Sequence, residues 1–153
     1  AIRYPRGEGR NVEWHNEMHE QPVGRGRVLA EGDDVAILTI GPIASEAEKA
    51  VEMLAGRGIK AAHYDMIYLK PIDGALIENA ARKNCLIVTV EDGTVNGGLG
   101  STVRQWLDDN GMSRKLVNVG VPDRFVAQGT PAELYRQCGM DAGSIHDIIV
   151  SSL

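Results

Sequence analysis

The stretch that decides the fold is Leu86-Ile87-Val88-Thr89-Val90-Glu91-Asp92-Gly93, followed three residues later by Gly97-Gly98-Leu99-Gly100-Ser101. Residues 86–90 predict a strand that is buried on both faces of a sheet. Glu91 and Asp92 then leave the carboxyl end of that strand, and the glycines predict a flexible loop running into a helix. Open α/β sheets place their ligands at this position, beyond the carboxyl ends of the strands.

Strands and helices alternate on both sides of this stretch. This alternation with apolar strands predicts a mostly parallel sheet covered by helices on both faces, joined by right-handed crossovers. The expected strands span residues 25–30, 35–40, 59–65, 86–90 and 115–119. The expected helices begin at capping boxes formed by Ser45 with Glu48 and by Thr130 with Glu133, at the caps Asp73 and Asp141, and at Gly98.

Composition excludes several functional classes. The chain has 153 residues, enough for one domain with a core, and a net charge of −5. It has no basic block interleaved with aromatic residues, which argues against nucleic acid binding. No apolar run approaches the roughly 20 residues that span a bilayer. Cys85 and Cys138 lie far apart; we expect a reducing compartment without a disulfide, and Cys85 in the core.

The glycine loop permits two interpretations from its residues alone. Its glycines could let the backbone approach a ligand, with the helix start attracting an anion. They could instead serve a tight connection that needs positive φ at several positions, and the pattern alone slightly favours this second interpretation. The pattern matches neither a dinucleotide-binding fingerprint nor a phosphate-binding loop with its lysine.

Other candidate residues also have ordinary explanations. Arg6, after Pro5, carries a planar fork suited to phosphate, or simply faces solvent. His15 and His19 have the spacing of metal ligands on a helix, but no apolar stripe supports a helix there and no third ligand is evident. The neighbours Asp123 and Arg124 could brace a loop as an ion pair or contact a partner. The residues alone identify no catalytic site.

Several longer segments are distinctive. They are Tyr4-Pro5-Arg6-Gly7, Tyr68-Leu69-Lys70-Pro71-Ile72-Asp73, the glycine loop, and Gly120-Val121-Pro122-Asp123-Arg124-Phe125 followed by Gln128-Gly129-Thr130. Together they resemble the carboxy-terminal third of the 1-deoxy-D-xylulose-5-phosphate synthases, thiamine-diphosphate enzymes of the transketolase superfamily. The Lys-Pro element and the glycine loop also occur in the β subunits of 2-oxoacid dehydrogenases. The Pro-Asp-Arg-Phe string favours the synthases.

The resemblance implies a three-layer α/β/α fold of the transketolase carboxy-terminal type. Its five-stranded, mostly parallel sheet has the order 1-3-2-4-5, with the first strand antiparallel. The turn at residues 31–34 suggests instead a hairpin between the first two strands, but a short turn is the weaker signal. Residues 1–24 are expected to be a linker and the tail of a preceding pyrimidine-binding domain, and residues 25–153 the domain itself.

The resemblance also implies a reaction. Synthases of this family decarboxylate pyruvate on thiamine diphosphate and join the two-carbon unit to glyceraldehyde 3-phosphate, which yields a precursor of isoprenoids, thiamine and pyridoxal. The family's diphosphate–Mg²⁺ motif and its ring-activating glutamate have no counterpart in this chain. We therefore expect no catalytic residue, metal or cofactor here, and an inactive isolated chain. Arg6 matches a contact to the substrate phosphate, and Arg3 is a weaker second candidate.

The chain begins at Ala1 without Met, so we expect a piece of a longer polypeptide. The resemblance implies that this polypeptide is bacterial and cytoplasmic and forms a homodimer. Its partners are expected to be the other domains of that polypeptide, without nucleic acid or membrane. The alternatives are the equivalent domain of a 2-oxoacid dehydrogenase β subunit or another transketolase-like enzyme, and a stand-alone domain that binds a ligand or partner.

The expected strand order places the topological switch between residues 35–40 and 86–90. We expect a crevice there that serves a subunit or domain contact, because a carboxylate beside a glycine loop can pair with an arginine or with backbone donors. The crevice is predicted to be lined by Gly41, Pro42, Glu91, Asp92, Gly93, Gly97, Gly98 and Gly100.

Overall fold

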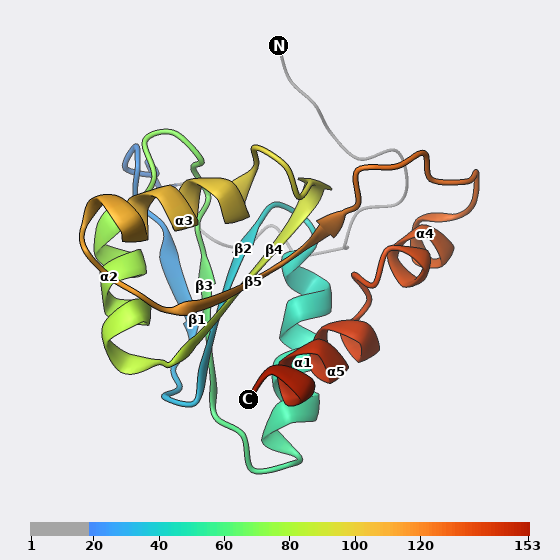
Figure 1. The fold of residues 1–153 in the computed structure, drawn as a ribbon, viewed down its shortest axis with the longest axis horizontal. Coiled ribbons are helices and arrows are strands. Elements are labelled where there is room, and N and C mark those ends of the chain that lie inside the picture. The colour runs from blue at the N-terminus through green and yellow to red at the C-terminus, as the bar shows by residue number, and fades with distance from the viewer. Residues whose placement is uncertain (1–18) are drawn as a thin grey trace.

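The computed structural model describes residues 19–153 and places a five-stranded sheet between two layers of helices (Figure 1). The strands are β1 (Arg27–Ala30), β2 (Val35–Ile40), β3 (Ala61–Asp65), β4 (Leu86–Thr94) and β5 (Lys115–Val121). The helices are α1 (Ala44–Ala55), α2 (Gly74–Lys83), α3 (Leu99–Asp109), α4 (Pro131–Gln137) and α5 (Ala142–Ser152). Among these residues, no helix has the length and apolar character needed to cross a membrane.

The strand order is β1-β3-β2-β4-β5, with β1 antiparallel to β3 and the other pairs parallel. This confirms the fold class and excludes the hairpin suggested by the turn at residues 31–34. That turn is tied to the start of β3 instead: Asp34 N donates to Lys60 O at 3.0 Å, and Lys60 N donates to Asp34 Oδ2 at 2.7 Å. The chain can therefore pass from β1 to β2 with β3 lying between them.

Each face of the sheet buries its own core. Alternate residues of a strand point to opposite faces, and in β2 Ile37 packs with α1 and α5 whereas Leu38 packs with α2 and α3. Both side chains are fully buried. Figure 1 shows the two helix pairs on opposite sides of the sheet, with α4 at the periphery. Burial on both faces explains why the central strands have nearly continuous apolar sequences.

Two of the four predicted side-chain caps are confirmed. Thr130 forms a capping box with Glu133, and Pro131 occupies the first turn of α4. Asp73 caps α2 by accepting from the backbone N–H groups of Ala75 and Leu76. Its second oxygen accepts from Gly26 N at 3.0 Å, so the same carboxylate also anchors the chain that leads into β1.

The other two caps are corrected. Ser45 does not cap α1, because the chain already turns at Gly41 and Pro42 and the helix begins at Ala44 with Ile43 as N-cap. Asp141 stands at the N-cap of α5, but its carboxylate accepts from the Ser144 hydroxyl at 2.5 Å rather than from the backbone. The first amide of α5, Ala142 N, donates instead to a glutamate of α1, Glu46.

The two cysteines are free thiols. The prediction that Cys85 lies in the core is wrong, because this residue precedes the buried part of β4 and is exposed at the junction with α2. Its nearest described hydrogen-bond partner is the backbone oxygen of Asp34, at 3.9 Å.

Candidate functional site

The candidate site lies at the carboxyl end of β4, which is longer than predicted. The strand does not stop at Val90 but continues to Thr94. Val90 pairs with Val119 of β5 and Thr94 with Val121, so β4 carries extra residues in a bulge at its end. Asp and Gly are poor strand formers, and pairing with β5 overrides that local preference. Glu91 and Asp92 therefore belong to a bulged strand end, not to a free loop.

The side chain of Glu91 turns inward and caps α3. Only 5% of this residue is exposed. Its Oε2 accepts from Leu99 N at 2.8 Å, and its Oε1 accepts from Gly100 N at 3.1 Å. These amides belong to the unpaired donors at a helix start, where the helix dipole also favours negative charge. The anion that this helix start attracts is therefore a carboxylate of the chain itself, an arrangement that was not expected from the sequence.

Two glycines of this loop are explained by close packing rather than by unusual backbone angles. A Cβ on Gly98 would lie 1.8 Å from Glu91 Oε2, and a Cβ on Gly100 would lie 2.3 Å from Asn118 Cγ. Within the loop only Gly97 has positive φ, at 79°. The expectation of positive φ at several glycines is therefore wrong, because close packing explains Gly98 and Gly100.

The second predicted loop lies beside the first. Ile40 pairs with Glu91, so Gly41 and Pro42 follow β2 next to the bulged end of β4. Gly41 and Pro42 are exposed, as is Gly97, whereas Glu91 and Gly100 are buried. Asp92, Gly93 and Gly98 are half-buried.

The Pro122–Phe125 loop follows β5 and lies at the same carboxyl end of the sheet. Asn96 Nδ2 donates to Asp123 Oδ2 at 3.2 Å, and Val95 N donates to Val121 O at 3.1 Å. Within residues 19–153, Asp123 and Arg124 form no ion pair, which removes the bracing interpretation of these two residues. Phe125 is fully exposed beyond this anchor.

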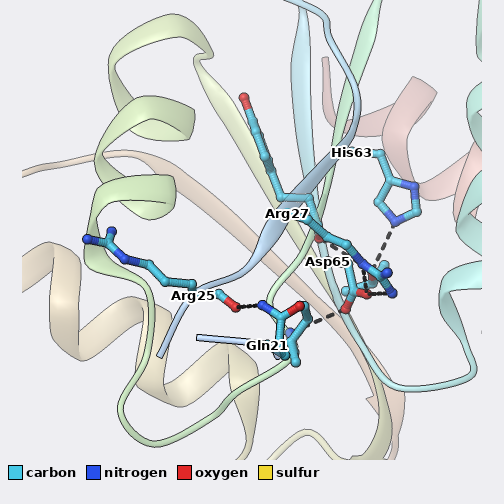
Figure 2. A network of polar contacts seen from close by, with 8 residues as sticks. Gln21, Arg25, Arg27, His63 and Asp65 are labelled. Atoms are coloured by element: carbon cyan, nitrogen blue, oxygen red, sulfur yellow. Dashed lines mark hydrogen bonds and ion pairs between the residues drawn. The ribbon is translucent and has the colours of Figure 1, made fainter. Parts of the chain in front are cut away.

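A second polar network joins β1 to the carboxyl ends of β2 and β3. Arg27 and Asp65 point toward each other in Figure 2, with Nη2 and Oδ2 2.7 Å apart. The buried ring of His63 shares a hydrogen bond of 2.9 Å with the hydroxyl of Thr39. Thr39 is fully buried, so this pair is not open to a substrate. The network holds the edge strand β1 against the sheet.

We expect His63 to make the fold sensitive to acid. Burial lowers the pKa of His63 below its ordinary 6.5. The negative charges of Glu48 and Asp65 act in the opposite direction and raise this pKa, but burial is the larger effect. As the pH falls below 6.5, the unfolded chain binds a proton that the folded chain does not, so stability is lost until the folded pKa is reached. The loss is at most about 1.4 kcal/mol per pH unit. Urea unfolding of the wild type and of His63→Gln between pH 7.5 and 5 tests this expectation: the difference between their free energies of unfolding should narrow with acid, and a constant difference contradicts it.

The remaining predicted residues fall into two groups. Arg3, Arg6 and His15 lie outside the described residues. His19 is exposed and belongs to no helix or strand. Within residues 19–153, no group of His, Cys, Asp or Glu side chains is arranged to hold a metal ion.

Comparison with known proteins places the chain in a family. Residues 24–145 match the family model described as the transketolase C-terminal domain. The chain belongs to this family.

Among curated proteins, this transketolase C-terminal domain is 49% identical over 145 residues to the 1-deoxy-D-xylulose-5-phosphate synthase of Parabacteroides distasonis, covering 95% of the chain and 23% of that synthase. It is 44% identical over 153 residues to the synthase of Bacteroides fragilis, covering 99% of the chain and 24% of that protein. The chain thus spans about a quarter of the length of these relatives.

Solved structures agree on the fold. A protein described as "Split gene transketolase, inactive beta4 tetramer" is 38% identical with a TM-score of 0.80, covering 88% of this chain and 43% of the other. A transketolase mutant from Pichia stipitis is 20% identical with a TM-score of 0.58, covering 82% of this chain and 17% of the other, which supports the fold alone. Both the family resemblance and the strand order expected for the transketolase C-terminal domain are confirmed.

Proposed function

We propose that this transketolase C-terminal domain is the supporting carboxy-terminal domain of a thiamine-diphosphate-dependent synthase. The synthase would condense pyruvate with glyceraldehyde 3-phosphate to 1-deoxy-D-xylulose 5-phosphate. The observation that carries the proposal is the 49% identity with a synthase of that name along 95% of the chain. The proposal includes a bacterial cytoplasmic location, which rests on these relatives alone.

The described residues do not fit thiamine diphosphate. Among residues 19–153 there is no acidic or histidine cluster to hold its Mg²⁺. The amino terminus of α3, a natural place for a diphosphate, is occupied by the Glu91 carboxylate. In the proposal, cofactor and metal are therefore held by other parts of the polypeptide. Residues 25–153 form the supporting domain, and residues 1–24 link it to the preceding domain and carry Arg6 and Arg3 toward the substrate phosphate.

The contribution of this domain would be assembly. The proposed contact surface is the edge at Gly41, Pro42 and Gly97, extended by Arg124 and Phe125, which are exposed. Arginine and aromatic side chains are enriched at the energetic centres of interfaces. The split-gene neighbour is described as an inactive β4 tetramer, which supports both self-association and the absence of activity from such a chain alone. A homodimer of the complete synthase follows from the same proposal.

A domain exchange tests the proposal. The segment of the Parabacteroides distasonis synthase that aligns with this chain is replaced by this chain, and formation of 1-deoxy-D-xylulose 5-phosphate is measured. We expect kcat within about tenfold of the parent, because the exchanged cores share a fold and packing tolerates related sequences. The matched control is a synthase with the segment deleted, which should be inactive.

The alternative functions give a different result. A domain of a 2-oxoacid dehydrogenase β subunit, or a stand-alone binding domain, lacks complementary contacts to the rest of the synthase. An exchanged protein that folds and forms the parent's oligomer but makes no product would therefore contradict the proposal.

A further inference from the structure

An open hollow of about 460 Å³ lies at the amino-terminal ends of β4 and β5, the end of the sheet opposite the glycine loop. Residues 82–85, at the junction of α2 with β4, form one wall, and residues 113–115, at the junction of α3 with β5, form the other. Leu86 pairs with Lys115 across the two strands, so the junctions lie side by side. The volume falls in the range of about 300–1,000 Å³ that is usual for sites of small molecules.

Positive charge gathers in this hollow although the whole chain is acidic. Its lining includes the cations Arg82, Lys83, Arg114 and Lys115, in a chain of net charge −5. Two of them have carboxylate partners: Arg82 pairs with Glu78 at 2.6 Å, and Lys83 with Glu31 at 3.4 Å. Both pairs are exposed at the rim, where ion pairs contribute little and exchange readily.

The other two cations have no carboxylate partner within residues 19–153. Arg114 donates to the backbone oxygens of Ala81 and Ser113, and Lys115 to that of Ser152. The contacts to Ala81 and Ser152 stabilise helix ends, where cations are favourable. They use only part of the five N–H donors of an arginine and the three of a lysine. Free donors and two uncompensated charges therefore remain at the hollow.

The geometry points to a binding site for a small, multiply charged phosphate anion, such as a diphosphate or a phosphate ester. Guanidinium groups bind phosphate oxygens through paired hydrogen bonds, and an ammonium adds a point charge. Arg114 and Lys115 would supply these contacts, Ser113 a hydroxyl donor, and Arg82 and Lys83 a positive rim. The site lies at the opposite end of β4 from the glycine loop, and it is independent of the proposed synthase reaction.

Cys85 reports on this site because it is an exposed free cysteine among the residues that line the hollow. In a Cys138→Ser background of the full chain, a neutral dipyridyl disulfide modifies Cys85: the thiolate attacks one sulfur, forms a mixed disulfide and releases one pyridinethiol. We expect inorganic diphosphate to slow this reaction saturably at constant ionic strength. Arg114→Gln combined with Lys115→Gln should raise the half-protecting concentration at least tenfold, the loss expected for one charge-assisted contact.

The matched control is Lys49→Gln combined with Arg57→Gln, which removes two cations outside the hollow, one on α1 and one just after it. It changes the net charge by the same amount as the double variant in the hollow. This control should leave protection unchanged. Thermal melting verifies that each variant folds, and Lys115→Gln alone serves if the double variant does not. Absence of saturable protection in the parent chain would overturn the site, and so would equal loss of protection in the control, because screening alone would then explain the effect.

Discussion

Gly98→Ala is expected to lower the free energy of unfolding by about 3 kcal/mol, since two hydrogen bonds to a buried carboxylate are worth about 1.5 kcal/mol or more each. The added methyl group would lie 1.8 Å from Glu91 Oε2, so the carboxylate must leave the amides of Leu99 and Gly100. For a chain of this size the expected decrease in melting temperature is about 6–12 °C. Differential scanning calorimetry measures it directly.

Gly93→Ala is the matched control. Gly93 also faces Glu91, but a Cβ there would lie at an ordinary contact distance of 3.7 Å, and its φ is not positive. We expect a change within about 1 kcal/mol, because alanine also lowers the entropy of the unfolded chain. Equal destabilisation by the two substitutions would show that the helix cap is not what Gly98 protects.

Arg6→Ala is expected to weaken the use of glyceraldehyde 3-phosphate about ten- to a hundredfold in kcat/KM, measured in the domain-exchanged synthase. This expectation rests on the proposed function and on a charge-assisted contact to phosphate worth about 1.5–3 kcal/mol. The KM for pyruvate should change much less, because pyruvate carries no phosphate.

Arg10→Ala provides the comparison, since Arg10 lies in the same amino-terminal segment but outside the Tyr4-Pro5-Arg6-Gly7 string that resembles the synthases. It should leave both substrates unaffected. If Arg6→Ala impaired pyruvate and glyceraldehyde 3-phosphate equally, Arg6 would be a structural residue instead.

The fold was predictable because its central signals are local and redundant. The buried strand at Val35–Ile40 has the predicted bounds, and Asp73 caps α2 as its position indicates. The boundaries that differ depend on long-range pairing. β4 extends to Thr94 because β5 offers a partner, and α1 begins at Ala44 because Gly41 and Pro42 already turn the chain. The order of the strands came from the family resemblance, not from the turn at residues 31–34.

The candidate site was predictable only in position. The sequence placed Glu91 beside the glycine loop but did not indicate whether its carboxylate faces solvent, a partner or the helix. That direction depends on the bulge in β4 and on the absence of a Cβ at Gly98, both of which are three-dimensional features. A glutamate at the end of a buried strand, followed by glycines at a helix start, is the signal that could have indicated an internal cap.

In the proposed function, this domain supports a synthase without binding its cofactor. Calorimetric titration of the 153-residue chain with thiamine diphosphate and Mg²⁺ tests this claim most directly. We predict no saturable heat at micromolar cofactor, because the described residues offer no metal cluster and the α3 amino terminus is already capped by Glu91. Saturable binding at micromolar cofactor would contradict the supporting role and assign the cofactor site to this chain.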